Sequence, residues 1–186
     1  MHKIAIRPLV LTTLVLAAAF SRIVPHLPNF SPLNAIALFA AAHFTARTQA
    51  VALPLAATWL SDLYLNNVTY AQPNTGFVWG YAGMQWQYGA YLLIAVFGLW
   101  LFRAGKSLWR IAVGVLASGM IFFLVSNFGV WISGSLYPPT AEGLLACYTA
   151  GLPFYQGTIL GDLFYSTLLF GSFALAERKL PQLQAV

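Results

Sequence analysis

The sequence predicts an all-α integral membrane protein with six transmembrane helices, and three observations support this class. Apolar residues other than glycine make up 60% of the 186 residues, and charged residues make up only 7%. The mean hydropathy is +0.74. A soluble domain carries about 25% charged residues, so this composition excludes a soluble globular domain, a disordered chain and a coiled coil. The apolar residues also fall into six separate runs, which sets the expected number of helices.

Each run is close to the length that a membrane-spanning helix needs. A helix crosses about 30 Å of hydrocarbon with about 20 residues, because each residue adds about 1.5 Å. The six expected spans run from Pro8 to Val24, Ser31 to Phe44, Ala50 to Leu65, Tyr88 to Phe102, Trp109 to Ile132 and Phe154 to Ala176. The second and fourth are short, so we expect interfacial residues or neighbouring helices to shield them. Residues 1–19 also have the pattern of a cleavable signal peptide, whose removal would leave five helices.

The basic residues predict the orientation. With six spans and both termini in the cytoplasm, the outer side holds only Arg22 among the nine Lys and Arg residues. The cytoplasmic side holds the others: Lys3, Arg7, Arg47, Arg103, Lys106, Arg110, Arg178 and Lys179. Such an excess is typical of cytoplasmic loops. The net charge of +5 therefore needs no nucleic acid as a partner, and the scattered basic residues form no face that could follow phosphates.

The long loops then all lie on the outer side. They cover residues 25–32, which include three prolines, residues 66–87 and residues 133–153. Long ordered loops are uncommon unless they have a function, and the inner connections between helices are short. This asymmetry predicts a ligand site that opens outward.

Asp62 and Asp162 are the only acidic residues expected within or beside the helices. They occupy matching places in a weak internal repeat, in which Thr58–Tyr64 (TWLSDLY) aligns with Thr158–Phe164 (TILGDLF). Inverted repeats are common in transporters, although seven residues can also match by chance. A carboxylate in hydrocarbon costs ~2.5–3.5 kcal/mol and usually has a partner. Each aspartate therefore either binds a cation or a polar ligand, or has a structural partner, which for Asp62 would be Arg22.

Other candidate side chains lie in or beside the outer loops. His26 is either a ligand to a metal or metallocofactor or an interfacial hydrogen-bonding residue. Cys147 is the only cysteine, which excludes an internal disulfide and a CxxC metal site; it is either a soft metal ligand or a small apolar residue that fills space. Trp79 and Tyr81 belong to an aromatic, amide-rich loop, which suits a large flat ligand and equally suits a membrane-interface girdle.

Motifs for catalysis are missing from the chain. The sequence contains no GxxxxGK[ST], HExxH or GxSxG pattern and no paired cluster of cysteine and histidine. We therefore expect a transport or binding protein rather than an enzyme. An enzyme that uses Asp62 and Asp162 as an acid/base pair is the least supported alternative.

Several stretches resemble a known group of membrane proteins. The segment Arg22–Phe39 (RIVPHLPNFSPLNAIALF), Ser126–Trp131 (SNFGVW), Tyr137–Thr140 (YPPT) and Cys147–Tyr165 look like signatures of small bacterial membrane proteins that are placed with the substrate-binding (S) components of energy-coupling-factor vitamin transporters. The six short helices, the two inner termini and the long outer loops are also similar to those components.

The resemblance implies a function. S components bind a vitamin or a metal ion in a pocket under their outer loops, and most dock on a coupling subunit driven by two ATPases. Solitary cobalamin transporters of proteobacteria are similar to this chain in size and layout, and in them a cysteine ligates cobalt. Here the only thiol comes late in the chain, at Cys147, and the 66–87 loop has none.

The sequence as a whole predicts a vitamin-uptake protein of the bacterial cytoplasmic (inner) membrane, with cobalamin or a related corrinoid as the transported ligand and no cofactor of its own. Its expected partners are the vitamin, the lipid bilayer and, unless it is solitary, the coupling subunit. The residues expected to bind the ligand are His26, Asn29, Asp62, Trp79, Tyr81, Asn127, Tyr137 and Asp162, with Cys147 as the candidate cobalt ligand. Two alternatives stay open: an S component for another vitamin or metal ion, and a non-transporting membrane assembly or scaffold protein.

Overall fold

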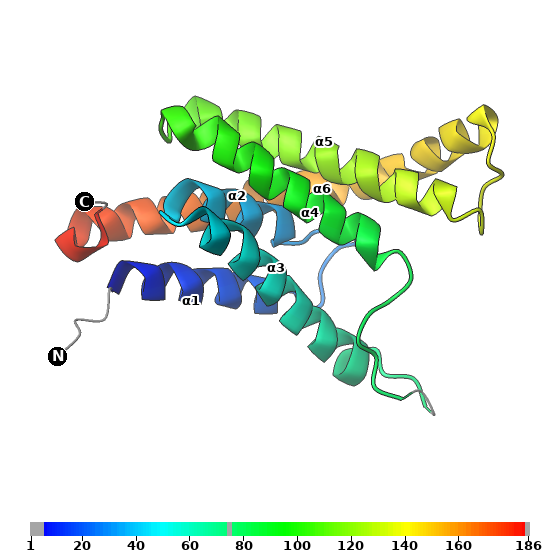
Figure 1. Ribbon diagram of the computed structural model, residues 1–186, viewed down its shortest axis with the longest axis horizontal. Helices are drawn as coiled ribbons and strands as arrows, with labels where there is room; N and C mark the ends of the chain where they lie inside the picture. The colour runs from blue at the N-terminus through cyan, green and yellow to red at the C-terminus, as the bar shows by residue number, and fades with distance from the viewer. Residues whose placement is uncertain (1–5, 74–75, 185–186) are drawn as a thin grey trace.

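The computed structural model describes residues 6–73 and 76–184, which form a bundle of six α-helices (Figure 1). The helices are α1 (Ile6–Ser21), α2 (Leu33–His43), α3 (Arg47–Tyr64), α4 (Met84–Leu101), α5 (Leu108–Ile132) and α6 (Ala141–Lys179). A π-helical turn (Leu65–Thr69) extends α3, and 3₁₀ turns follow α4 (Phe102–Ala104) and α6 (Pro181–Leu183). The described residues contain no strand. The predicted all-α class is confirmed.

Three of these helices are long and apolar enough to cross a membrane. They are α4 with its 3₁₀ turn, α5 and α6. Large apolar side chains stay exposed along them, among them Leu93, Trp100, Leu116 and Leu168. Extended apolar surface of this kind marks contact with a membrane or a partner. The helices α1 and α2 are apolar but shorter, with 16 and 11 residues. The fold therefore indicates a membrane protein, while the number of six spans stays a prediction.

The short helix α2 lies at the centre of the bundle. It contacts each of the other five helices, and every residue from Leu33 to Ala41 is buried. Its alanines allow close approach, as small residues do at helix interfaces in membranes. At Gly98 of α4, for example, an added Cβ would lie only 2.8 Å from the Cβ of Ala41. The expectation that neighbouring helices shield this short segment is confirmed.

The two ends of the bundle differ in charge, because the helices alternate in direction and the basic residues lie in the segments that meet at one end. The start of α1, the α2–α3 and α4–α5 connections and the end of α6 gather at one end, on the left in Figure 1. This end carries the basic residues Arg7, Arg47, Arg103, Lys106, Arg110, Arg178 and Lys179. We call it the basic end. Lys3 lies outside the described residues. This grouping fits the predicted cytoplasmic face, although the orientation in a membrane stays a prediction.

An ion pair holds the two chain ends together at the basic end. The guanidinium of Arg7 lies 2.7 Å from a carboxylate oxygen of Glu177 and also donates to the carbonyl of Leu183. The first helix is thereby tied to the last one. Leu11, Val15 and Ala19 of α1 are buried in the same core.

The predicted loop from Ser133 to Pro153 is wrong in its second part. The connection is short, and α6 begins at Ala141 and continues through Pro153 to Lys179. The hydroxyl of Thr140 accepts the N–H of Gly143 at 3.2 Å and caps the helix. The expected span from residue 154 to 176 is therefore the later part of a 39-residue helix. Such a helix is about 58 Å long, about twice the hydrocarbon core of a bilayer.

The predicted loop 66–87 is also shorter than expected, because the π-helical turn covers its first residues and α4 begins at Met84. The side chain of Asn67 binds the remaining connection between this turn and α4. Its amide donates to the carbonyl of Val78 at 2.9 Å, and its oxygen accepts the N–H of Val78 at 2.7 Å. This pair of hydrogen bonds fixes the return of the chain toward α4.

Candidate functional site

The connection between α1 and α2, residues 22–32, lies directly against α6. Its backbone fits over Gly157 and Gly161, where any side chain would collide with it. A Cβ at Gly161 would lie 2.7 Å from the nitrogen of Ser31, and one at Gly157 would meet the carbonyl of Pro28. Asn29 adopts a positive φ of 59°, which asparagine tolerates better than most residues. The two glycines therefore allow the connection to form part of the wall of a site between the helices.

Two adjoining cavities open at this connection, at the end of the bundle opposite the basic end. The larger cavity, of about 600 Å³, lies between α4, α5 and α6. The smaller cavity, of about 130 Å³, lies between the connection, α2 and α6. Four residues line both: Asn29, Gln87, Phe122 and Thr158. Pockets for small organic ligands usually measure about 300–1,000 Å³, so the larger cavity alone has the size of a ligand site.

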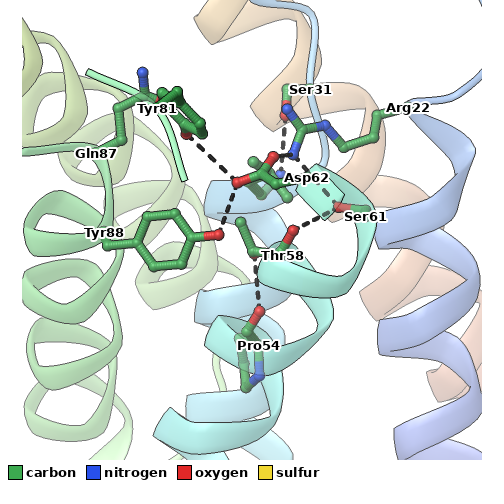
Figure 2. A network of polar contacts seen from close by, with 10 residues as sticks. Arg22, Ser31, Pro54, Thr58, Ser61, Asp62, Tyr81, Gln87 and Tyr88 are labelled. Atoms are coloured by element: carbon green, nitrogen blue, oxygen red, sulfur yellow. Dashed lines mark hydrogen bonds and ion pairs between the residues drawn. The ribbon is translucent and has the colours of Figure 1, made fainter. Parts of the chain in front are cut away.

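Asp62 on α3 lies beside these cavities in a network of polar contacts (Figure 2). Its carboxylate forms an ion pair of 2.5 Å with Arg22, which stands just after α1. The hydroxyl of Tyr88 donates to the other carboxylate oxygen at 2.7 Å, and that of Tyr81 lies 3.4 Å from the same atom. Arg22 also reaches the hydroxyl of Ser61 at 3.4 Å. The predicted structural pair of Asp62 and Arg22 is confirmed.

The tyrosines of this network remain hydrogen-bond donors. Burial, together with the negative charge of Asp62, raises the pKa of Tyr81 well above its usual value. Its hydroxyl also lies 3.0 Å from the side-chain oxygen of Gln87, which lines both cavities. Arg22 and Gln87 line the smaller cavity, whereas Asp62 itself is not among the lining residues.

Asp162 on α6 is also buried, at 1% exposure, but its environment differs from that of Asp62. One of its oxygens accepts hydrogen bonds from the amide of Asn34 at 3.0 Å and from the hydroxyl of Ser118 at 3.4 Å. The ion pairs of the described residues do not include it. Asp162 and Asn34 both line the smaller cavity. A buried carboxylate without a cationic partner in a membrane protein is a functional-site candidate.

The structure brings four of the predicted ligand-binding residues to the cavities. Asp162, His26 and Asn29 line the smaller one, and Asn29 and Asn127 line the larger one. The side chain of Asn127 donates to the carbonyl of Phe123 one helical turn earlier, at 2.8 Å. The ring of His26 is exposed and lies 2.9 Å from the carbonyl of Leu27.

The other predicted residues lie elsewhere. Trp79 is 66% exposed and stacks on Trp59, away from both cavities. Tyr137 is half-buried in the α5–α6 connection and lines neither cavity. Tyr81 acts through Asp62 and Gln87, as described above.

Cys147 is buried on α6, where its thiol donates to the carbonyl of Asn127 at 3.3 Å. It lines neither cavity. Within the described ranges, no group of three or more His, Cys, Asp and Glu residues could hold a metal ion. The role of Cys147 as a cobalt ligand stays a prediction, and its position gives that role no support.

Several residues that line the cavities were not among the predicted ones. They include Arg22, Asn34, Trp86, Gln87, Tyr91, Phe122, Tyr155 and Thr158. Asn34 could have been found from the sequence, because it is the single amide in the apolar helix LNAIALFAAAH. Thr158 could have been found as well, since it opens the repeat that ends after Asp162. Trp86 and Gln87 lie in the aromatic, amide-rich loop, whereas Tyr91, Phe122 and Tyr155 gave no signal, because aromatic side chains occur throughout this chain.

Fold and site together define a helical membrane protein with a polar cavity that reaches its core. The chain belongs to a family of unknown function, DUF6580, whose model matches residues 2–183. No curated protein and no solved structure matches the chain. Membership of this family is thereby shown, while the kinship with S components of vitamin transporters stays a prediction.

Proposed function

We propose that this protein binds a vitamin-sized solute on the outer side of a bacterial cytoplasmic membrane and takes part in its uptake, in the manner of an S component. The observation that carries the proposal is the pair of adjoining cavities with an unpaired buried carboxylate at Asp162. The cavities lie at the end of the bundle opposite the basic end. If the basic end is cytoplasmic, the cavities face the side from which a nutrient arrives.

The larger cavity has the chemistry of a site for a flat solute with polar edges. Phe122, Phe154 and Tyr155 give it aromatic walls, and Ser126 and Asn127 supply polar groups. Ligand sites commonly combine apolar and aromatic walls with a few polar groups that fix the orientation of the ligand. A corrinoid, with its flat ring and amide-bearing edge, matches this combination and remains the first ligand to test.

A corrinoid would exceed the larger cavity, of about 600 Å³, and extend past its rim. Of the two candidate cobalt ligands, His26 lines the smaller cavity and Cys147 lines neither. Within this proposal His26 is therefore the better candidate for an axial ligand. Uptake would involve either a coupling subunit with two ATPases or this protein alone.

The test is an absorption spectrum of the detergent-purified protein, prepared with and without cobalamin. The proposal predicts stoichiometric corrin bands that persist through size-exclusion chromatography. A shifted band that is lost in His26→Ala and kept in Cys147→Ala would identify the axial ligand. A colourless protein that also binds no corrinoid in calorimetry would overturn the corrinoid, and titration with other vitamins would then test the wider proposal.

Two tyrosines provide a matched pair of variants for the site. Tyr155 lines the larger cavity, whereas Tyr137 does not. We expect Tyr155→Ala to weaken solute binding by about tenfold, which corresponds to the loss of one good contact. Tyr137→Ala should change the affinity by less than about twofold. The reverse order would contradict a solute site in the larger cavity.

A further inference from the structure

The smaller cavity is surrounded by an excess of negative charge. Three charged side chains lie in or beside it, namely Arg22, Asp62 and Asp162. The 2.5 Å ion pair neutralises Arg22 with Asp62. One carboxylate, that of Asp162, is left without a counter-charge among the described residues. Burying a charge is costly unless it is paired, so the Asp162 carboxylate needs either a bound cation or a proton.

A second observation at the same place points to a ligand. The side chain of Asn34 is 4% exposed, and its Oδ1 atom has no hydrogen-bond partner among the described residues. The nitrogen of the same amide donates to Asp162, which suits an ionised carboxylate. An amide oxygen only accepts, so a hydrogen-bond donor or a cation is needed to satisfy it. Asn34 and Asp162 both line the smaller cavity.

The polar side chains around Asp162 offer oxygen atoms to a ligand. Besides Asp162 and Asn34, Thr158 lines the cavity, and the hydroxyl of Ser118 lies 3.4 Å from the Asp162 carboxylate. Carboxylate, amide and hydroxyl oxygens suit hard cations. Because Asp62 neutralises Arg22, the single carboxylate of Asp162 balances one positive charge only. The set therefore fits a small monovalent cation.

We propose that Asp162 and Asn34 form a sodium site in the smaller cavity. The inference deepens the proposed function and rests on it in one respect: the ion would bind together with the solute. Asn29, Gln87, Phe122 and Thr158 form walls of both cavities. An ion that fixes these walls would raise the affinity for the solute, and by linkage the solute would raise the affinity for the ion by the same factor.

The experiment is equilibrium binding of radioactive sodium ions to the detergent-purified protein, with choline replacing sodium to hold the ionic strength constant. No organic ligand is added. The inference predicts one sodium ion per chain and loss of at least 90%, about tenfold, of this binding in Asp162→Asn. Absence of sodium binding to the wild-type protein would overturn the inference, since it would mean that the Asp162 carboxyl is neutralised by a proton.

The double variant Arg22→Ala with Asp62→Asn is the matched control. It removes a second buried carboxylate from the same repeat position together with the guanidinium that neutralises it, so the net charge around the cavity stays that of Asp162. Sodium binding should persist in this variant. Equal loss of sodium binding in both variants, with both folded by size-exclusion chromatography, would contradict a site at Asp162.

Asn34→Leu keeps the carboxylate and removes the amide oxygen, so it decides the question if Asp162→Asn does not fold. We expect it to weaken sodium binding by about tenfold, and unchanged binding would overturn the role of Asn34. The outcome is separable from that of the proposed function. Sodium binding without any solute binding would support the sodium site and overturn the uptake proposal. Solute binding without sodium binding would support the uptake proposal and overturn the sodium site.

Discussion

The two aspartates of the repeated segment occupy equivalent local positions and have different partners. In each copy a buried threonine precedes the aspartate by one helical turn, and its hydroxyl bonds to the carbonyl four residues back, at 2.8 Å for Thr58 and 3.4 Å for Thr158. Asp62 meets an arginine and two tyrosines, whereas Asp162 meets an amide and a serine. The first carboxylate is neutralised by the protein, and the second is not.

The residue before each aspartate accounts for part of this difference. Ser61 donates to the carbonyl of Thr58 at 2.8 Å and accepts from Arg22 at 3.4 Å, so it helps to hold the arginine. Gly161 has no side chain, and the backbone of Ser31 takes its place against α6. The repeated segment thus places a threonine and an aspartate on the same face of each helix. The residues packed against that face determine whether the carboxylate is paired or lines a cavity.

The largest loss of stability should come from removing the cationic partner of Asp62. Arg22→Ala leaves the Asp62 carboxylate buried without its counter-charge, which typically costs about 3–5 kcal/mol. We expect a loss near the lower figure, because the arginine side chain is still 19% exposed. Chemical denaturation in detergent measures it. The double variant Arg22→Ala with Asp62→Asn should recover part of the loss, and no recovery would mean that Arg22 acts through other contacts.

The next largest loss of stability should come from placing a serine before Asp162, as the segment around Asp62 has. Gly161→Ser would place a side chain where the backbone of Ser31 now lies, and overpacking of this kind costs about 1–3 kcal/mol. Gly171→Ser on the same helix is the control, since no atom lies within 4 Å of its added Cβ; it should change the stability by less than about 0.5 kcal/mol. Equal effects at both positions would contradict the close approach of the connection.

The tyrosines of the paired copy should contribute unequally. Tyr88→Phe removes a 2.7 Å hydrogen bond to the Asp62 carboxylate, and hydrogen bonds to charged groups contribute about 1.5–3 kcal/mol. Tyr81→Phe removes a contact of 3.4 Å, so its cost should be about 0.5 kcal/mol. Thermal unfolding of the two variants in the same detergent compares them directly. A larger loss for Tyr81→Phe would show that Gln87, its second partner, matters more than the carboxylate.

The smallest effect on stability should come from the unpaired copy. Asp162→Asn keeps the shape of the side chain and an oxygen that can accept from Asn34 and Ser118. No ion pair of the described residues is lost, so we expect a change below about 1 kcal/mol in sodium-free buffer. A loss as large as that of Arg22→Ala would assign Asp162 a structural role.

The sequence predicted the helical class, the grouping of basic residues and the pair of Asp62 with Arg22, because all three follow from hydropathy, charge and helix ends. It failed at residues 141–153, which were predicted to belong to an outer loop and are part of α6. There the contact of Gly151 with the side chain of Asn127 and the bond from Cys147 to the backbone of Asn127 hold a helix against α5.

The candidate site was predictable only in part for a similar reason. Asp162 was predicted as an acid within an apolar helix, and Asn29 and Asn127 lie in segments that carry the resemblance; all three line the cavities. Trp79 was predicted from its aromatic, amide-rich loop but packs on Trp59 instead. Aromatic and amide residues have the same local signature at a membrane interface and in a ligand site, so only the packing of distant segments separates the two.

The central claim is that one aspartate holds the fold and the other binds a cation. The most direct measurement is the shift in thermal unfolding midpoint when sodium replaces choline, made side by side for the wild-type protein, the double variant Arg22→Ala with Asp62→Asn, and Asp162→Asn. An ion that binds only the folded state raises its midpoint. The account predicts a sodium-dependent rise for the wild-type protein and for the double variant, and none for Asp162→Asn. An equal rise in all three proteins, or none in the wild-type protein, would contradict it.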